Sequence, residues 1–325
     1  MTRRIQNKIA GSRYALPITV AYVLLAFLFF GLSDVGQWVS LGSLLLSMLL
    51  MVLLNNVNAL IRIYSRMVSC SFLVLTVMHM ALMPVMQQEV ATFALPGNLV
   101  SDIVQPCFIA SFLFFFNAYQ DKFSPGWVFF SFLFIGIASI FFVPMLFYLP
   151  LLWILLGANV LALSLRNFCA SLLGILLPFW VVGSYALYAD RLSEFGDYCL
   201  TIGSLGPLFD YSQIALPQII SFAFVVVLLL TGTVHFLRNS YRDKIRTRMI
   251  YESLITIGLF TVLFILAQPQ HFNTLMRVLI VVTSPLIAHF IALTETRITN
   301  IATIVIMVVT FLITFCNRWM LSLLS

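Results

Sequence analysis

Residues 126–163 form an apolar run of nearly forty positions without a charged side chain. One helix of that length would be far longer than the hydrocarbon core of a bilayer, which needs only about 20 residues to be crossed. Pro144 lies within the run, and proline interrupts helices because it has no N–H to donate. We therefore expect two membrane-spanning helices here, with the chain turning near Pro144.

Apolar runs of spanning length recur along the whole chain, which is 62% hydrophobic and 9% charged. An ordinary soluble domain has about 45–50% apolar and about 25% charged residues, so a water-soluble fold is excluded. Backbone polar groups in lipid must be satisfied within each segment, which favours helices. We predict an all-α, polytopic membrane helical bundle of about eleven transmembrane helices in a single integral membrane domain, residues 1–325. The expected spans are 14–32, 38–54, 68–86, 101–119, 126–142, 144–163, 168–188, 214–236, 250–267, 275–292 and 298–316. The second of these, 38–54, is short and is expected to tilt little or to cross only partly.

The distribution of basic residues predicts the orientation of these spans. With the N-terminus in the cytoplasm, fourteen of the 17 Lys and Arg residues fall on the cytoplasmic side, and five of these fourteen lie in the strongly basic segment RNSYRDKIRTR (238–248). Only Arg191, Arg277 and Arg318 fall outside. This asymmetry is typical of inner-membrane proteins, and an odd number of spans places the C-terminus outward.

Several kinds of chemistry have no motif in this sequence. There is no phosphate-binding glycine loop and no H-E-x-x-H, and the five cysteines and four histidines show no metal-ligand spacing. We therefore predict no metal site, and no cofactor can be identified. The net charge of +6 is spread over short links between spans, so nucleic acid is not an expected partner.

Polar residues collect near the predicted outer face. Asp34 stands in the first outward turn, Arg191 and Asp197 share a later loop, and His271 and Arg277 flank the start of the tenth span. A guanidinium group matches a phosphate, and a carboxylate beside it can act as general base toward a sugar hydroxyl. We interpret Asp34 as a candidate catalytic base and the other four as candidate substrate-binding residues. The alternative is that Arg277 only reaches the headgroups and that Arg191 pairs with a neighbouring glutamate.

On the inner side, NNVNALIRIYSR (55–66) has apolar residues at helical spacing, with Arg62 and Arg66 four positions apart. This pattern predicts a short helix along the membrane surface, whose arginines contact anionic lipid headgroups. The alternative is an interfacial anchor without further function.

Three stretches together resemble an uncharacterised family of multi-spanning inner-membrane proteins of Bacteroidota. They are NNVNALIRIYS (55–65), FLFFFNAYQDKFSPGWVFFSFLFIGIASIFFVPMLFYLPLLWILL (112–156) and SLRNFCASLLGILLPFW (164–180), and the late segment PQHFNTLMRVLIVVTSPLIAHFIA (269–292) is similar to the closing region of that family. The resemblance implies a multi-pass protein of a bacterial cell inner membrane and implies no activity.

A weaker resemblance is to the GT-C glycosyltransferases, which use polyprenyl-phosphate sugars. Residues 112–150 follow their order of an apolar helix, a polar turn with Asp121 and Lys122, then Gly136 and Pro144. That family carries an acidic catalytic base in its first outward loop, and Asp34 occupies the corresponding place. The resemblance implies a polyprenyl-phosphate-linked saccharide as substrate.

We therefore expect glycosyl transfer or polymerisation of lipid-linked saccharides at the outer, periplasmic face. The alternative is a non-catalytic membrane subunit of an envelope-assembly or secretion complex, and a transporter is a third hypothesis. The expected partners are membrane lipids, the polyprenyl-linked saccharide and other membrane proteins. An enzyme should gather Asp34, Arg191 and Arg277 around one outward cavity, a subunit should present an apolar groove, and a transporter should have broken helices meeting at mid-membrane.

Overall fold

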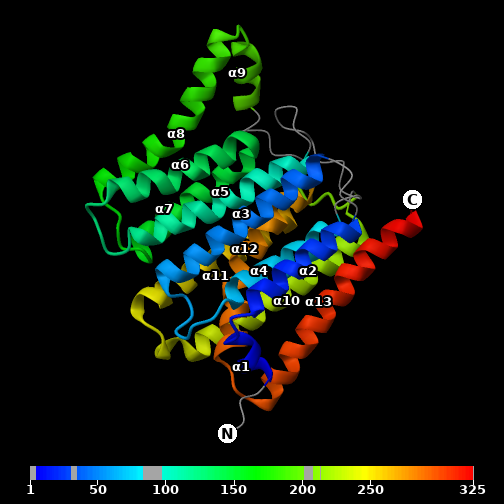
Figure 1. Cartoon of the computed structure of the whole chain (residues 1–325). Coiled ribbons are helices and arrows are strands. Elements are labelled where there is room, and N and C mark those ends of the chain that lie inside the picture. Colours follow the sequence, from blue (N-terminus) through cyan, green and yellow to red (C-terminus); the bar gives the residue numbers. More distant parts are fainter. Residues whose placement is uncertain (1–4, 31–34, 83–96, 201–207, 213, 325) are drawn as a thin grey trace.

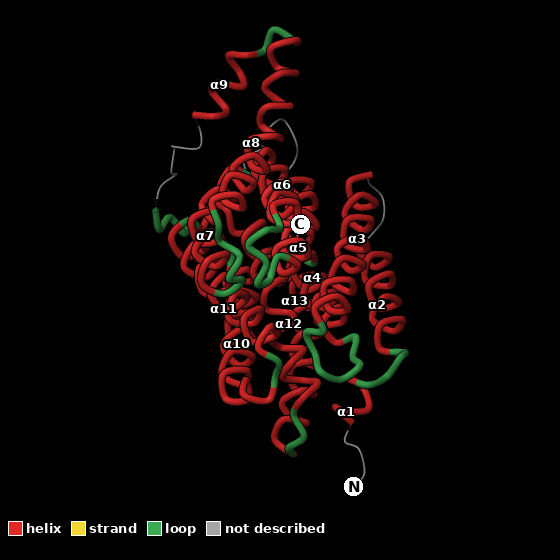
Figure 2. The backbone as a smooth tube through the Cα atoms, turned by 90° about the vertical axis from the view of Figure 1, so that its left-hand side faces the viewer, coloured by secondary structure: helices red, strands yellow, loops and turns green. Residues whose placement is uncertain are grey.

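The computed structural model describes residues 5–30, 35–82, 97–200, 208–212 and 214–324. These residues form helices and contain no strand (Figures 1 and 2), so the all-α prediction is confirmed for them. The helices are α1 Ile5–Ala10, α2 Ala15–Phe30, α3 Val35–Asn58, α4 Met67–Met80, α5 Gly97–Asn117, α6 Pro125–Phe141, α7 Leu149–Ala158, α8 Leu165–Tyr188, α9 Leu192–Leu200, α10 Leu216–Asn239, α11 Ile245–Ala267, α12 Phe272–Leu293 and α13 Arg297–Leu324. Short 3-10 turns are η3 Val143–Tyr148, η4 Ser240–Arg242 and η5 Pro269–His271.

Seven of the described helices are long and apolar enough to cross a bilayer. Four shorter apolar helices, Ala15–Phe29, Met67–Met80, Pro125–Phe141 and Val143–Ala158, accompany them. Many large apolar side chains are exposed along these helices, as on α13 and α8. A contiguous apolar surface of this kind is typical of contact with lipid, so the protein is membrane-embedded.

The uncharged run 126–163 breaks near Pro144, as the sequence predicts. Helix α6 ends at Phe141, and the backbone of Phe142 leaves the helical region with φ −140° and ψ 88°. Pro144 then lies in the 3-10 turn η3, and α7 begins at Leu149 with Pro150 in its first turn. Proline suits a first turn because the N–H it lacks would have no helical partner there.

The structure corrects two expectations around residue 58. Helix α3 runs over 24 residues, so the second span is a full-length apolar helix and not a short one. The surface helix predicted over 55–66 is wrong beyond Asn58, because Ala59 adopts a φ of 47°, in the left-handed region that ends helices. Leu60 and Ile61, two of the apolar residues that suggested this surface helix, are buried in the protein.

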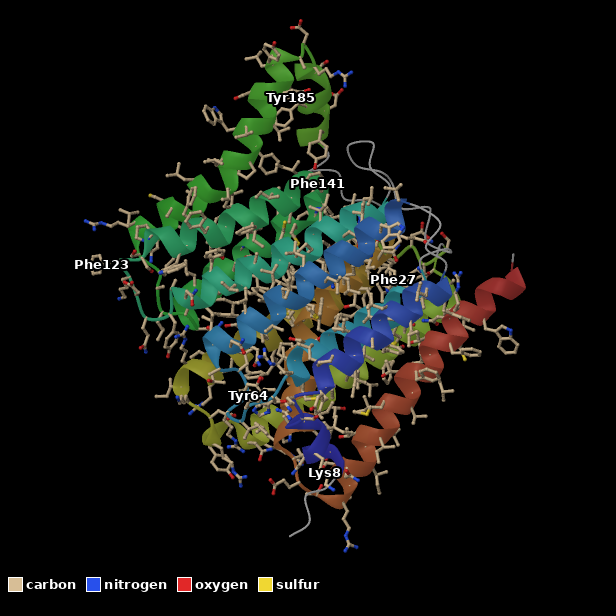
Figure 3. All side chains as sticks on the ribbon, viewed as in Figure 1. Lys8, Phe27, Tyr64, Phe123, Phe141 and Tyr185 are labelled. Carbon is tan, nitrogen blue, oxygen red and sulfur yellow. The ribbon has the colours of Figure 1, made fainter. Side chains whose placement is uncertain are left out.

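At one end of the bundle, hydrogen bonds link the loops between helices to one another and to neighbouring helix ends. The Ser65 hydroxyl donates to the Ala10 carbonyl at 2.7 Å, and Gln120 N donates to Val160 O at 2.8 Å. The Arg246 guanidinium bridges the ends of α3 and α5 by donating to Asn58 Oδ1 at 2.9 Å and to a backbone carbonyl of α5 at 3.1 Å. We call this the basic end, because it carries most of the described Lys and Arg residues. Figure 3 shows Lys8 and Tyr64 at this end, and Phe141 and Tyr185 toward the opposite end.

Helix α12 occupies the centre of the bundle. Every residue from Phe272 to Ala292 is buried, and α12 packs against α4, α5, α10 and α11. Helices α6 and α8 pack closely at one side, and the α8–α9 hairpin extends past the neighbouring helices at the end opposite the basic end (Figure 1). The central position of α12 means that any polar side chain on it must find its partners within the protein.

Candidate functional site

The predicted outer residues occupy different environments. Asp34, the candidate base, lies outside the described residues. Arg191 is exposed at the turn between α8 and α9, and Asp197 is exposed on α9. His271 is partly buried in η5, with its ring 5.3 Å from the ring of Phe142 in an edge-on arrangement. The structure thus places Arg191 and Asp197 on the projecting hairpin and His271 on the bundle.

Arg277 is fully buried on α12 and forms an ion pair with Asp102 of α5. The Ser40 hydroxyl of α3 donates to the same carboxylate, and the Ser43 hydroxyl donates to the Asp102 backbone carbonyl. The interaction links α3, α5 and α12. Because its guanidinium is buried against a carboxylate, Arg277 does not lie with Arg191 around one outward cavity.

The sequence contains a signal for this pair, because Asp102 and Arg277 are opposite charges near the starts of two apolar runs. Asp102 is the sixth residue of α5 and Arg277 is the sixth residue of α12. Both helices begin at the same end of the bundle, so opposite charges at equal depth can meet. Next to the pair, Ser101 and Thr274 share a hydrogen bond of 2.9 Å. A desolvated ion pair needs such supporting polar contacts to offset the loss of hydration.

The convergent charged site that the structure does contain is at the basic end. A cavity of about 870 Å³ lies between α10, the α12–α13 connection and the segment after α3. Three arginines line it: Arg62 from that segment, Arg238 from the last turn of α10, and Arg242 from η4. We call it the arginine cavity. The other polar residues that line it are Thr231, His235, Asn239, Thr294, Glu295, Thr296 and Thr299.

The carboxylate closest in sequence to these arginines is engaged elsewhere. Asp243 Oδ2 lies 3.1 Å from Nε2 of the buried His289 ring on α12. The His235 ring on α10 lies 5.4 Å from the His289 ring, and the Asn239 side chain is 3.2 Å from His235 Nδ1. In the described part of the chain, the close contacts between a basic and an acidic side chain are Arg277 with Asp102 and His289 with Asp243, so none involves an arginine of this cavity.

The charge balance of the arginine cavity favours an anion. Three guanidinium groups against the single carboxylate of Glu295 leave a net charge of about +2 on the lining residues. Guanidinium groups present paired N–H donors that match the oxygens of phosphate and carboxylate. A volume of about 870 Å³ is within the range of pockets that hold small molecules.

The sequence identified only part of this site. Arg62 was expected to contact a lipid headgroup, whereas the basic segment 238–248 served only to predict orientation. The structure brings Arg62, Arg238 and Arg242 to one cavity, which no spacing along the chain could show. Arg66 is elsewhere: its guanidinium lies 5.4 Å from the Tyr64 ring centre, and its Nε donates to the Tyr64 hydroxyl at 3.2 Å. The headgroup role of either arginine stays a prediction.

Within the described residues, no group of three or more His, Cys, Asp or Glu side chains could hold a metal ion. No family model, curated protein or solved structure matches this chain.

Proposed function

We propose that the chain crosses the inner membrane of a bacterium eleven times, with the basic end in the cytoplasm and the C-terminus outside. The seven long apolar helices and the four shorter ones correspond in position to the eleven predicted spans. The excess of Lys and Arg at the basic end supports its cytoplasmic orientation, because positive residues are retained on that side during insertion.

Reporter fusions test this topology. Alkaline phosphatase, active only outside the inner membrane, is expected to be active when fused after residue 325 and inactive when fused after residue 163. A green fluorescent protein should show the reverse. Activity of phosphatase at residue 163, or its absence at residue 325 in a fusion that is stably produced, would contradict the proposed orientation.

We infer that the protein binds a phosphate-bearing anion in the arginine cavity at the cytoplasmic face. The observation that carries this inference is the convergence of Arg62, Arg238 and Arg242 on one cavity without a paired carboxylate. Repulsion among three cations disfavours the unoccupied site, and an anion relieves it. The carrier of the predicted glycan reaction, a polyprenyl phosphate, belongs to this chemical class. Glycosyl transfer at the outer face with Asp34 as base remains a separate prediction.

The ligand source is tested with two probes on the purified full chain. Inorganic pyrophosphate, titrated by calorimetry, represents a soluble anion. Phosphatidylglycerol, compared with phosphatidylcholine by native mass spectrometry, represents a lipid headgroup. Binding of pyrophosphate would identify a soluble phosphate ligand. Selective retention of phosphatidylglycerol alone, lowered by Arg238→Gln, would identify a lipid in the arginine cavity. Binding of neither probe would overturn the proposal.

Neutralising one cavity arginine is expected to weaken binding. Arg238→Gln should raise the Kd of the bound probe about tenfold, because a hydrogen bond to a charged group contributes about 1.5–3 kcal/mol and water screens part of it here. Arg166→Gln is the matched control, since Arg166 stacks over the Phe123 ring at 5.7 Å and does not line the cavity. An equal loss in the two variants would show only a general effect of surface charge.

A further inference from the structure

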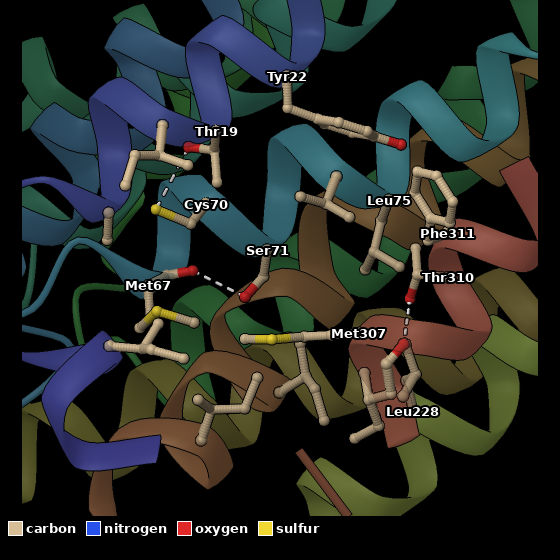
Figure 4. A pocket seen from close by; sticks show the side chains of 17 residues that line it. Thr19, Tyr22, Met67, Cys70, Ser71, Leu75, Leu228, Met307, Thr310 and Phe311 are labelled. Carbon is tan, nitrogen blue, oxygen red and sulfur yellow. Dashed lines mark hydrogen bonds between the residues drawn. The ribbon is translucent and has the colours of Figure 1, made fainter. Parts of the chain in front are cut away.

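A second cavity shares no lining residue with the arginine cavity. It has a volume of about 490 Å³ and is lined by side chains of α1, α2, α4, α10, α12 and α13 (Figure 4). Leu75 of α4, Ile287 of α12 and Met307 of α13 are among the apolar residues of its wall. We call it the apolar cavity.

Three hydroxyl groups in the wall of the apolar cavity, those of Thr19, Ser71 and Thr310, are already satisfied. Thr19 donates to Leu16 O at 2.9 Å. Ser71 donates to Met67 O at 2.7 Å, and Thr310 donates to Ile306 O at 2.7 Å (Figure 4). Each of these three hydroxyls thus bonds to a carbonyl of its own helix and needs neither a ligand nor water. A cavity with such a wall excludes water and accepts apolar groups.

Cationic groups flank the end of the apolar cavity that lies toward the basic end. Ala15 and Met67 line that end, and Arg66 directly precedes Met67. The hydrogen bond from the Ser65 hydroxyl to Ala10 O brings the residues before α4 to the connection between α1 and α2, where Arg13 lies. Arg13 and Arg66 rest over tyrosine rings at 5.1 and 5.4 Å, and neither has an ion pair with a described carboxylate.

We propose that the apolar cavity binds one hydrocarbon chain of an anionic membrane lipid, with the lipid phosphate near Arg13 and Arg66. A protein helix does not fit, because a cylinder about 10 Å across would fill a volume of about 490 Å³ within roughly one helical turn. A lipid chain is thinner, and filling the cavity restores dispersion contacts that its wall otherwise lacks. Anionic headgroups complete the fit by pairing with the two arginines. This site does not rest on the proposed function of the arginine cavity.

Photocrosslinking of the wild-type protein tests the position of the chain. The probe is phosphatidylglycerol with a diazirine in one acyl chain, in vesicles with the full-length protein, followed by peptide mass spectrometry. We expect adducts on cavity residues such as Cys70, Ser71 and Met307. Adducts spread evenly over the lipid-facing helices, or absent from the cavity wall, would overturn the proposal.

A pair of matched variants tests the cavity itself. Val74→Phe fills part of the apolar cavity. It is expected to lower the yield of cavity adducts about tenfold or more, because several methylene groups of the lipid chain no longer fit in the cavity. Val308→Phe adds the same bulk on the exposed side of α13, outside the cavity lining, and should leave the yield unchanged. Equal yields from the two variants would contradict the assignment.

A separate experiment tests the contact between Arg66 and the anionic lipid headgroup. Arg66→Gln should lower cavity labelling by the phosphatidylglycerol probe several-fold and leave labelling by the corresponding phosphatidylcholine probe unchanged. If wild type is labelled equally by the two probes, the anionic part of the proposal is wrong.

Discussion

Replacing Arg277 by methionine is expected to lower the free energy of unfolding by about 3–5 kcal/mol. The reason is the position of the Asp102 carboxylate, which is 2% exposed and would lose its charged partner within the helical core. A buried charge without a partner is far less stable than the pair or than an apolar replacement of both members. The measurement is equilibrium unfolding of the detergent-solubilised full chain, followed by circular dichroism.

Two further variants separate the ion pair from other effects. The double substitution Arg277→Met with Asp102→Leu removes both charges and should recover most of the lost stability. Arg191→Met changes the same residue type at an exposed position and should shift stability by less than about 0.5 kcal/mol. If the single variant is as stable as wild type, or the double variant is no better than the single one, the buried pair does not stabilise the bundle.

Gly174→Ala is expected to destabilise the protein by about 1–3 kcal/mol, although alanine favours helices more than glycine does. A Cβ at Gly174 of α8 would lie 2.6 Å from Phe129 O and 3.0 Å from Leu133 N. Both are backbone atoms of α6, so they cannot rotate aside and the two helices must separate. A Cβ at Gly136 of α6 would likewise lie 2.9 Å from Ile175 O of α8, so both helices depend on small residues for their close approach.

The control is a glycine in an open environment. A Cβ at Gly42 of α3 would meet nothing within 4 Å, so Gly42→Ala should stabilise the helix by up to about 1 kcal/mol. The two substitutions are chemically identical, and opposite signs in the same unfolding measurement are the expected result. Destabilisation of similar size at both positions would mean that packing between α6 and α8 is not the cause.

The sequence predicted the class of fold because that class depends on local properties. Length, hydropathy and the absence of charge along each run are enough to favour membrane helices, and Pro144 marks a break because proline acts on its own turn. The same reasoning was wrong over 59–66, where helical spacing of apolar residues suggested a surface helix. There the left-handed Ala59 and the burial of Leu60 and Ile61 depend on packing against the rest of the bundle.

The sites depended on contacts between distant segments, which a single sequence does not contain. Arg277 was expected to face a phosphate, yet packing of α12 at the centre leaves it next to Asp102. Arg62 and the segment 238–248 were recognised separately, but only the folded chain brings Arg62, Arg238 and Arg242 to one cavity. Local sequence is therefore enough to specify a bundle of membrane helices, because each helix is specified by its own residues. The tertiary structure alone decided which charges are paired in the core and which line a cavity, because electrostatic and packing energies depend on distance in space.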